Sequence, residues 1–198
     1  MIKSIIFDFD GVIHDTLELA FNISKTLYHN LSLDDYKDFF NGNVYAGDTV
    51  SDENKNKKFF SMQNKQFKEL IIEREIKAEL LKMKDQFDLF VISSNMETTL
   101  NNYFENNNII HIFKKVLGVE THKSKVEKFK MLQKEFSLTK ENSIFITDTL
   151  GDIREANKIG FNTIAVDFGF HERERLKIGK PLKIISNFKE LLPLIQSL

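Results

Sequence analysis

Two carboxylates and a glycine directly follow a short apolar run near the start of the sequence. The run is Ile5-Ile6-Phe7, and Asp8-Phe9-Asp10-Gly11-Val12 comes after it. Alternate side chains of an extended backbone point the same way, so Asp8 and Asp10 are expected on one side, with Phe9 turned into the core. Two carboxylates this close repel, and one takes up a proton unless a cation sits between them. The stretch therefore indicates a metal-assisted active site; the alternative is an acidic turn, where Asp is common.

A second acidic group follows another apolar run, at 144–147. Asp148 ends this run, and Asp152 comes one helical turn later. Ligands of α/β proteins bind at the carboxyl ends of the strands, so neighbouring central strands would bring Asp148 close to Asp8 and Asp10. Carboxylate oxygens with few other protein donors suit Mg²⁺. The sequence thus predicts a magnesium site; the alternative for Asp152 is a helix cap.

Two more stretches have side chains that could bind an anion. Ser93-Ser94-Asn95 closes an expected strand, where a hydroxyl and an amide can bind a phosphate oxygen. The same residue types also favour the N-cap of a helix. Lys125 opens an expected helix and could neutralise a phosphoryl group or a nucleophile, with Lys123 as its rival because lysine is abundant in this region.

The elements that must position these residues alternate along most of the chain. Strands are expected at 5–7, 87–93, 113–119, 144–147, 163–166 and, as an edge strand, 182–185. Helices are expected at 98–106, 125–136, 151–159, 171–178 and 188–198, the second with a capping box of Ser124 and Glu127 and the third ended by Gly160. This order predicts an α/β fold with a Rossmann-like parallel sheet and helices on both faces.

The segment that follows the first acidic pair has a different character. No strand is expected between Asp15 and Asp85. Helical spacing covers 16–30, 33–40, 55–70 and 71–84, and the Gly- and Asn-containing stretch 41–48 is expected to be a loop. We therefore expect an α/β core domain of residues 1–14 and 80–198, with an all-helical insert of residues 15–79 beside its active edge.

Composition limits the classes of partner. The 198 residues include 41% hydrophobic and 29% charged residues, with a net charge of -1, which gives no indication of binding to nucleic acid or to an anionic membrane. The chain has no Cys, so disulfides, thiolate nucleophiles and Cys-ligated zinc are excluded. No signal peptide and no apolar run of ~18 residues is found, so we expect a soluble, cytoplasmic protein.

Taken in order, the four sites resemble the motifs of the haloacid dehalogenase (HAD) superfamily. The resemblance matches Asp8-Phe9-Asp10-Gly11 to the first motif, Ser94 to the second, Lys125 to the third, and the Asp148 and Asp152 pair to the fourth. The insert resembles the helical C1 cap of this superfamily. The stretches 148–160 and 169–171 are similar to phosphoglycolate-phosphatase-like members.

The resemblance implies a covalent mechanism. Asp8 would attack phosphorus to form an aspartyl-phosphate, and Asp10 would act as general acid and then as general base. Asp8, the backbone carbonyl of Asp10 and Asp148 would hold Mg²⁺. Asp152 would orient Lys125 or a metal-bound water. These roles imply a phosphatase, since dehalogenating members need no acid at the position of Asp10.

The resemblance also implies how the substrate is held. Ser94, Lys125 and backbone N–H groups near Gly11 and Asn95 would bind the phosphoryl oxygens. Substrate choice should lie in the cap, where Asn43 and Tyr45 could face the active site and Val44 could anchor the loop. The expected partner is a small phosphorylated metabolite, bound by a monomer or a homodimer.

Some features of the sequence keep other functions open. Val12 stands where many members have Thr, and mutase-like members share Gly-Val here, so a sugar phosphomutase remains an alternative. Thr147 stands where Gly often precedes the acidic residue of the fourth motif, which adds bulk near the metal. A non-catalytic phosphoryl-binding module, such as a receiver, is the alternative from a different class.

Overall fold

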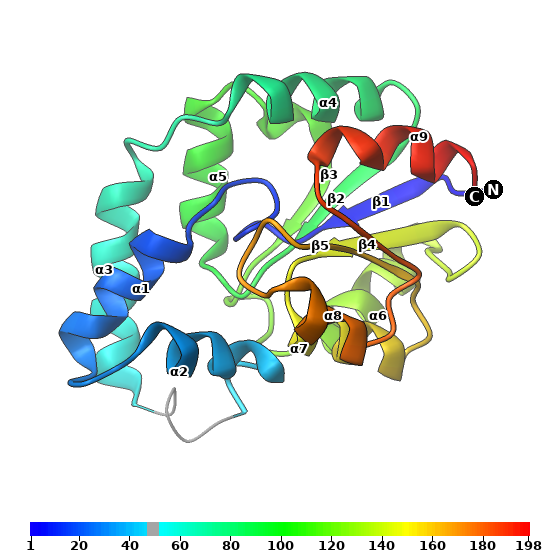
Figure 1. The fold of residues 1–198 in the computed structure, drawn as a ribbon. Helices are drawn as coiled ribbons and strands as arrows, with labels where there is room; N and C mark the ends of the chain where they lie inside the picture. The colour runs from blue at the N-terminus through cyan, green and yellow to red at the C-terminus, as the bar shows by residue number, and fades with distance from the viewer. Residues whose placement is uncertain (47–51) are drawn as a thin grey trace.

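A central parallel sheet organises the structure. The computed structural model describes residues 1–46 and 52–198, which form a six-stranded sheet in the order β3-β2-β1-β4-β5-β6 (Figure 1). The strands are β1 (Ser4–Phe7), β2 (Asp88–Ile92), β3 (Phe113–Leu117), β4 (Ser143–Thr147), β5 (Thr163–Val166) and β6 (Lys183–Ile185). The central strand β1 pairs with β2 and β4. This confirms the predicted fold class.

Helices cover both faces of the sheet. One face carries α4 (Arg74–Lys84), α5 (Glu97–Asn106) and α9 (Leu191–Gln196), and the other carries α6 (Lys125–Phe136), α7 (Leu150–Lys158) and α8 (Arg173–Ile178). Figure 1 shows α4 and α9 above the sheet, with α6, α7 and α8 below it. Strands covered on both faces read as continuous apolar runs, which explains why the strand signals in the sequence were strong.

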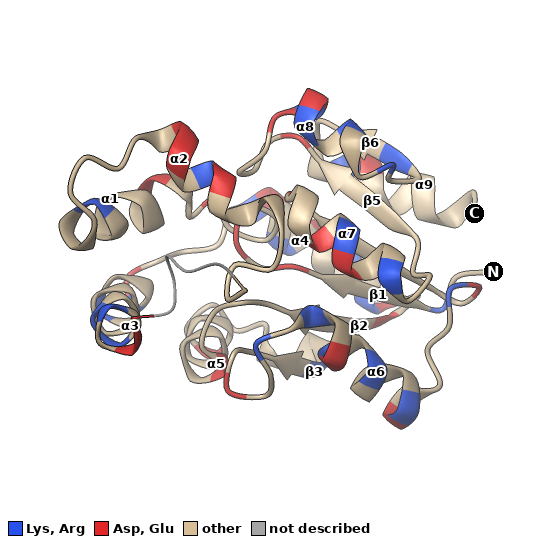
Figure 2. Cartoon of the chain, turned by 90° about the horizontal axis from the view of Figure 1, so that it is seen from below, with Lys and Arg blue, Asp and Glu red and all other residues tan. Residues whose placement is uncertain are grey.

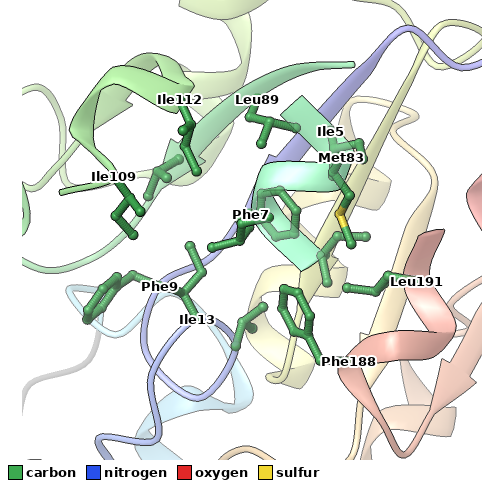
Figure 3. Close-up of a cluster of buried hydrophobic side chains, with 14 of the residues drawn as sticks. Ile5, Phe7, Phe9, Ile13, Met83, Leu89, Ile109, Ile112, Phe188 and Leu191 are labelled. Carbon is green, nitrogen blue, oxygen red and sulfur yellow. The ribbon is translucent and has the colours of Figure 1, made fainter. Parts of the chain in front are cut away.

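Alternate residues of β1 supply the two halves of the core. Ile5 and Phe7 pack with α4 and α9, while Ile6 packs on the opposite side with α6. Figure 3 shows Phe7 beside Phe188 and Met83, and the rings of Phe7 and Phe188 stack with centroids 6.2 Å apart. The burial of β1 fixes where the chain emerges at Asp8.

The insert after β1 is helical, as the sequence predicts. It contains α1 (Leu17–Leu27), α2 (Leu33–Asp38), a 3₁₀ turn η1 (Phe39–Asn41) and α3 (Glu53–Phe67), with no strand among the described residues from 15 to 85. These helices lie beyond the carboxyl ends of the strands (Figure 1). The predicted domain boundary at residue 80 falls inside α4, whose Leu80 and Met83 pack on the sheet. The division itself stays a prediction.

Two of the local predictions are wrong because distant residues take the hydrogen bonds involved. The expected helix at 71–84 begins only at Arg74, because the Asn107 side chain bonds the Leu70 carbonyl at 3.1 Å and the Ile72 N–H at 2.9 Å. The capping box of Ser124 and Glu127 does not form. Instead, the Ser124 hydroxyl donates to Glu155 Oε1 at 2.9 Å.

The remaining elements are short. The 3₁₀ turns η3 (Ile110–Ile112) and η4 (Phe188–Glu190) precede β3 and α9, so the single helix predicted at 188–198 is divided. Gly160 ends its helix with φ 75°, as predicted. The predicted loop is non-helical over residues 42–46, and its last two residues, 47 and 48, lie outside the described residues.

Charge is mixed along the surface helices. Figure 2 shows both acidic and basic positions on α2, α3, α6 and α7, in keeping with the net charge of -1. Within residues 1–46 and 52–198, we find no helix whose length and apolar character would let it cross a bilayer.

Candidate active site

Adjacent strands carry Asp8 and Asp148 to the same edge of the sheet. Asp8 follows the last residue of β1, and Asp148 follows the last residue of β4. The Asp8 N–H donates to the Ile146 carbonyl at 2.8 Å, which continues the pairing of these strands. The side chains are 5% exposed at Asp8 and fully buried at Asp148. Strand pairing alone therefore brings together two carboxylates that lie 140 positions apart in the sequence.

Lys125 joins the two acidic stretches. Its Nζ lies 2.7 Å from Asp8 Oδ2 and also bonds Asp152 Oδ2. The Thr147 hydroxyl donates to the same oxygen of Asp152 at 2.7 Å. The alternative role of Asp152 as a helix cap is wrong, since Thr149 is the N-cap of α7. The carboxylate of Asp152 instead holds Lys125 in place.

The structure places the members of two neighbouring pairs, Lys123 and Lys125 and then Ser93 and Ser94, in different surroundings. Lys123 is exposed, with its Nζ 6.0 Å from the centroid of the Tyr45 ring, so it does not enter the acidic group. Ser93 is fully buried, with its Oγ 3.4 Å from Asp10 Oδ2. Ser94 lines the pocket that contains Asp8 and Lys125.

The carboxyl group of Asp10 is held from two sides. Thr16 Oγ1 donates to its Oδ1 at 2.7 Å, and Ser93 Oγ faces its Oδ2. Burial raises the pKa of Asp10, while the Thr16 hydroxyl and Lys125 oppose the shift. A raised pKa keeps a proton available for transfer. Thr16 was not identified from the sequence, since a hydroxyl six residues from Asp10 gives no signal of its own.

Glycines surround the carboxylate of Asp148. A Cβ at Gly11 would lie 1.9 Å from Asp148 Oδ2, and one at Gly169 would lie 2.4 Å from the same atom. The Phe170 N–H donates to this oxygen at 2.7 Å. The other oxygen, Oδ1, is buried without a partner among the described residues. Burial raises the pKa of Asp148 to about 8.

This donor set fits a magnesium ion. In the part of the chain that the structure describes, no three His, Cys, Asp or Glu side chains are grouped closely enough to hold a metal. The predicted set needs only two carboxylates, from Asp8 and Asp148, and the carbonyl of Asp10. Mg²⁺ commonly binds to one or two carboxylates and keeps water and phosphate oxygens as its other ligands. The unpartnered Asp148 Oδ1 is an oxygen suited to that role.

The charges within the buried group are unevenly divided. Burial raises the pKa of Asp8 well above its ordinary value, although Lys125 opposes the shift. Burial alone would lower the pKa of Lys125, but the nearby carboxylates of Asp152 and Asp8 outweigh this effect and raise it. Burial would raise the pKa of Asp152, yet Lys125 lowers it. Lys125 and Asp152 are thus the charged pair, and Asp8 depends on a further cation.

Two pockets meet at Asp10. The first, here called the acidic pocket, measures about 30 Å³ and is lined by residues that include Asp8, Lys125, Asp148 and Asp152. The second, the aromatic pocket, measures about 110 Å³ and is lined mainly by residues of the helical insert. Both are lined by Asp10, Phe40, Val44, Ser94 and Phe170. A ligand that spans both would have its central bond next to Asp10.

Comparison with known proteins gives the family. The family model described as haloacid dehalogenase-like hydrolase matches residues 5–166. The chain belongs to this family. A search of curated protein sequences finds no significant match.

Solved structures share the fold of this haloacid dehalogenase-like hydrolase over its whole length. A haloacid dehalogenase-like family hydrolase from Streptococcus pneumoniae has 21% identity and a TM-score of 0.80, with 98% of this chain and 99% of the other covered. A predicted phosphatase from Clostridium acetobutylicum has 20% identity and a TM-score of 0.84, with 100% of both covered. A β-phosphoglucomutase from Clostridium difficile has 20% identity and a TM-score of 0.81, covering 100% and 96%.

In this hydrolase, hydrogen bonds join the loop at residues 42–46 to the α/β elements beside the acidic pocket. Asn43 Nδ2 donates to Glu155 Oε1 at 3.0 Å and to the Lys123 carbonyl at 3.3 Å. The Tyr45 hydroxyl donates to the Ser94 carbonyl at 2.5 Å. Val44 lines both pockets, so it does more than anchor the loop. The loop therefore bonds the core on both sides of the site.

The backbone N–H groups of Gly11 and Asn95, two of the residues predicted to bind phosphate, have partners within the protein. The Gly11 N–H donates to the His14 carbonyl at 2.8 Å, and the Asn95 N–H donates to Ser93 Oγ at 3.0 Å. The Asn95 side chain lines the aromatic pocket instead. Ser94 and Lys125 are the predicted phosphate-binding residues that line the acidic pocket.

A second buried lysine of this hydrolase was missed in the sequence. Lys128 is fully buried, and its Nζ donates to the Ser93 carbonyl. Burial lowers its pKa to about 7. Its sequence context does not distinguish it from Lys130, which is exposed. Lys128 supports the backbone that carries Ser93 and Ser94.

Proposed function

We propose that this hydrolase is a Mg²⁺-dependent phosphatase that cleaves a small phosphomonoester through an aspartyl-phosphate on Asp8. The observation that carries the proposal is the position of Asp10 at the junction of the two pockets. With a phosphoryl group in the acidic pocket and the alcohol in the aromatic pocket, the bridging oxygen lies next to a carboxyl group with a raised pKa.

The first step forms the covalent intermediate. A carboxylate oxygen of Asp8 attacks phosphorus, the new P–O bond forms, and the bond from phosphorus to the bridging oxygen breaks. Asp10 gives its proton to that oxygen, and the alcohol leaves neutral. Such positioned acid catalysis contributes ~10²–10⁴-fold in general.

The second step returns the enzyme to its starting state. Asp10, now a carboxylate, removes a proton from a water that attacks the phosphorus of the aspartyl-phosphate. The bond between phosphorus and the Asp8 oxygen breaks, which releases inorganic phosphate and restores both carboxyl groups. The hydrogen bond from Thr16 keeps the Asp10 carboxylate oriented between the two steps.

Positive charge and donors balance the phosphoryl oxygens. Lys125, held by Asp152, supplies one full charge next to Asp8, and Ser94 supplies a hydroxyl at the pocket wall. Asp8, the Asp10 carbonyl and Asp148 would hold Mg²⁺. When bound, the ion would supply the charge that offsets repulsion between Asp8 and an anionic substrate.

Hydrolysis of 4-nitrophenyl phosphate tests the proposal. The rate should depend on Mg²⁺, fall to the background level in excess chelator, and recover when Mg²⁺ is added back. Asp8→Asn should lower kcat by roughly 10³-fold or more, since the nucleophile is lost. Equal rates for the wild type and Asp8→Asn would reject the nucleophile assignment.

The alternative functions predict other outcomes. A sugar phosphomutase would isomerise a sugar phosphate in the presence of a bisphosphate primer and release little phosphate. A phosphoryl-binding module would hold a stable phosphoryl group without turnover.

A further inference from the structure

The aromatic pocket is the space that receives the alcohol part of a substrate, an assignment that rests on the proposed phosphatase function. Aromatic residues are the largest group in its wall. They include Tyr36, Phe39, Phe40 and Phe59 from the cap and Phe170 from the core. Phe40 meets Phe170 edge to face with centroids 5.1 Å apart, and Tyr36 meets Phe40 in the same way at 5.3 Å. The rings therefore form a packed wall with fixed orientations.

The polar atoms of this wall are mostly engaged within the protein. The Tyr45 hydroxyl bonds the Ser94 carbonyl. The Lys55 ammonium group lies over the Tyr28 ring, 4.4 Å from its centroid. Tyr45 thus presents its ring, and not a free hydroxyl, to a ligand.

Two side chains of this wall have a buried polar atom without a hydrogen-bond partner among the described residues: Asn95 through Nδ2, a donor, and Gln63 through Oε1, an acceptor. Gln63 is the one on the helical insert. It lies on α3, is 3% exposed, lines the aromatic pocket, and its Oε1 has no hydrogen-bond partner among the described residues. Buried acceptors of this kind are nearly always paired, and leaving one unpaired is unfavourable. A hydrogen-bond donor on the ligand would satisfy it.

The volume and the polarity of the aromatic pocket limit which alcohols it can hold. The volume of about 110 Å³ is comparable to that of a cavity of roughly 150 Å³ that holds one benzene ring. A nucleoside, with a base and a ribose, would extend beyond this volume. A hexose would enter with several hydroxyl groups, and the aromatic wall offers few partners for them.

We infer that the substrate is the phosphomonoester of a one-ring aromatic alcohol that carries a hydrogen-bond donor on its ring. The ring lies against Phe40, Phe59 and Phe170, the donor bonds Gln63 Oε1, and the phosphoryl group occupies the acidic pocket. The reaction releases the free aromatic alcohol and inorganic phosphate.

The test compares esters of primary alcohols, whose leaving groups are similar in basicity. The panel is 3-hydroxybenzyl, 4-hydroxybenzyl and benzyl phosphate, glucose 6-phosphate and adenosine 5′-monophosphate, each with Mg²⁺. We expect kcat/KM for the better hydroxybenzyl ester to exceed that for glucose 6-phosphate by roughly 100-fold or more, since an apolar pocket disfavours added hydroxyls by about that factor. Glucose 6-phosphate or the nucleotide as the equal or better substrate would overturn the inference.

Substitutions in the aromatic pocket test which side chains cause the preference for a hydroxybenzyl ester. Gln63→Leu should reduce the ratio of kcat/KM between the hydroxybenzyl and benzyl esters from about tenfold to about one, since the donor loses its partner. Phe59→Ala should lower kcat/KM for both benzyl esters. The control is Ile71→Ala, at a 74% exposed side chain that does not line the pocket, and it should preserve the ratio. An unchanged ratio in Gln63→Leu would refute the proposed hydrogen bond.

Binding separates this inference from the proposed function. If no ester is hydrolysed, the phosphatase proposal fails, and non-hydrolysable phosphonate analogues of the hydroxybenzyl and glucose esters are compared by calorimetry. Tighter binding of the hydroxybenzyl phosphonate supports the aromatic class even then. Equal or weaker binding rejects it.

Discussion

The ammonium group of Lys125 lies 2.7 Å from Asp8 Oδ2, and neither side chain is more than 7% exposed. Asp152 bonds the same ammonium group. Lys125 is therefore the common partner of two buried carboxyl groups, and removing it leaves both without an ion pair. Asp8 and Asp152, which are far apart in the sequence, are thus linked through this lysine.

Lys125→Met tests that dependence. Loss of one partner from a buried ion pair costs roughly 3–5 kcal/mol in the free energy of unfolding, so we expect a loss of that order. Turnover of 4-nitrophenyl phosphate should fall by ~10²–10³-fold, as for removal of one transition-state donor. The matched control is Lys130→Met on the same helix, which breaks only an exposed pair with Glu127 and should stay within ~0.5 kcal/mol. Similar stability and turnover for both variants would contradict the role assigned to Lys125.

Gly11→Ala should abolish activity through a steric clash with Asp148. The new Cβ would lie 1.9 Å from Asp148 Oδ2, and φ at Gly11 is 72°, which L-residues rarely adopt. Gly160→Ala is the control, since φ there is 75° but the nearest atom to its Cβ is 4.0 Å away. Both variants should lose ~1–2 kcal/mol of stability from backbone strain. Only Gly11→Ala should lose Mg²⁺-dependent turnover; a fully active Gly11→Ala would show that the space around Asp148 is not required.

Tyr45→Phe should weaken substrate binding without altering the chemical step. The change removes the hydrogen bond to the Ser94 carbonyl but keeps the ring in the aromatic pocket. A lost hydrogen bond of about 1 kcal/mol corresponds to roughly a fivefold rise in KM, with kcat nearly unchanged. Tyr103→Phe is the control, because its hydroxyl meets His14 at 3.0 Å, outside both pockets. A fall in kcat alone would argue against closure of the loop by this bond.

Lys128 should make stability depend on pH above neutrality. Its pKa is about 7 in the folded protein against an ordinary 10.5, so the unfolded chain binds more protons between these values. The free energy of unfolding therefore rises with pH across that range, by at most ~1.4 kcal/mol per pH unit. Below pH 7 the buried amine is charged, and its full cost to stability is present. Lys128→Met lacks the penalty. Its stability relative to the wild type, from urea unfolding, should therefore be greatest near pH 6.5 and decline toward pH 9.5.

The exposed residue Lys130 again provides the control for this comparison. The stability difference between Lys130→Met and the wild type should stay flat over the same pH range. A flat difference for Lys128→Met as well would show that the buried amine keeps its ordinary pKa.

Strong, local signals explain what the sequence could predict. The helix at 125–136 and the strand at 163–166 have the predicted bounds, because their apolar patterns are bounded by clear turn residues. The order of the strands brings Asp8 and Asp148 together, as expected from apolar runs that each end in a carboxylate. The position of Lys125 could be predicted only in combination with these runs.

Contacts between distant residues explain what the sequence could not predict. The capping box at Ser124 fails because Glu155, 31 residues away, takes its hydroxyl group. Asn107 breaks the helix before Arg74 from 35 residues away. Lys128 differs from Lys130 only in which way it faces in the folded chain, and burial decides its pKa. Such effects depend on packing that no local pattern contains.

The central claim is that Asp8 carries the phosphoryl group, and trapping it is the most direct test. Asp10→Asn keeps the nucleophile but lacks the base for the second step, so the intermediate should accumulate with 4-nitrophenyl phosphate, whose leaving group needs little acid assistance. After acid quench, peptide mass spectrometry should find one phosphoryl group on the peptide that contains Asp8, and none in the Asp8→Asn, Asp10→Asn double variant. A phosphoryl group on another residue, or steady turnover by the double variant, would contradict the account.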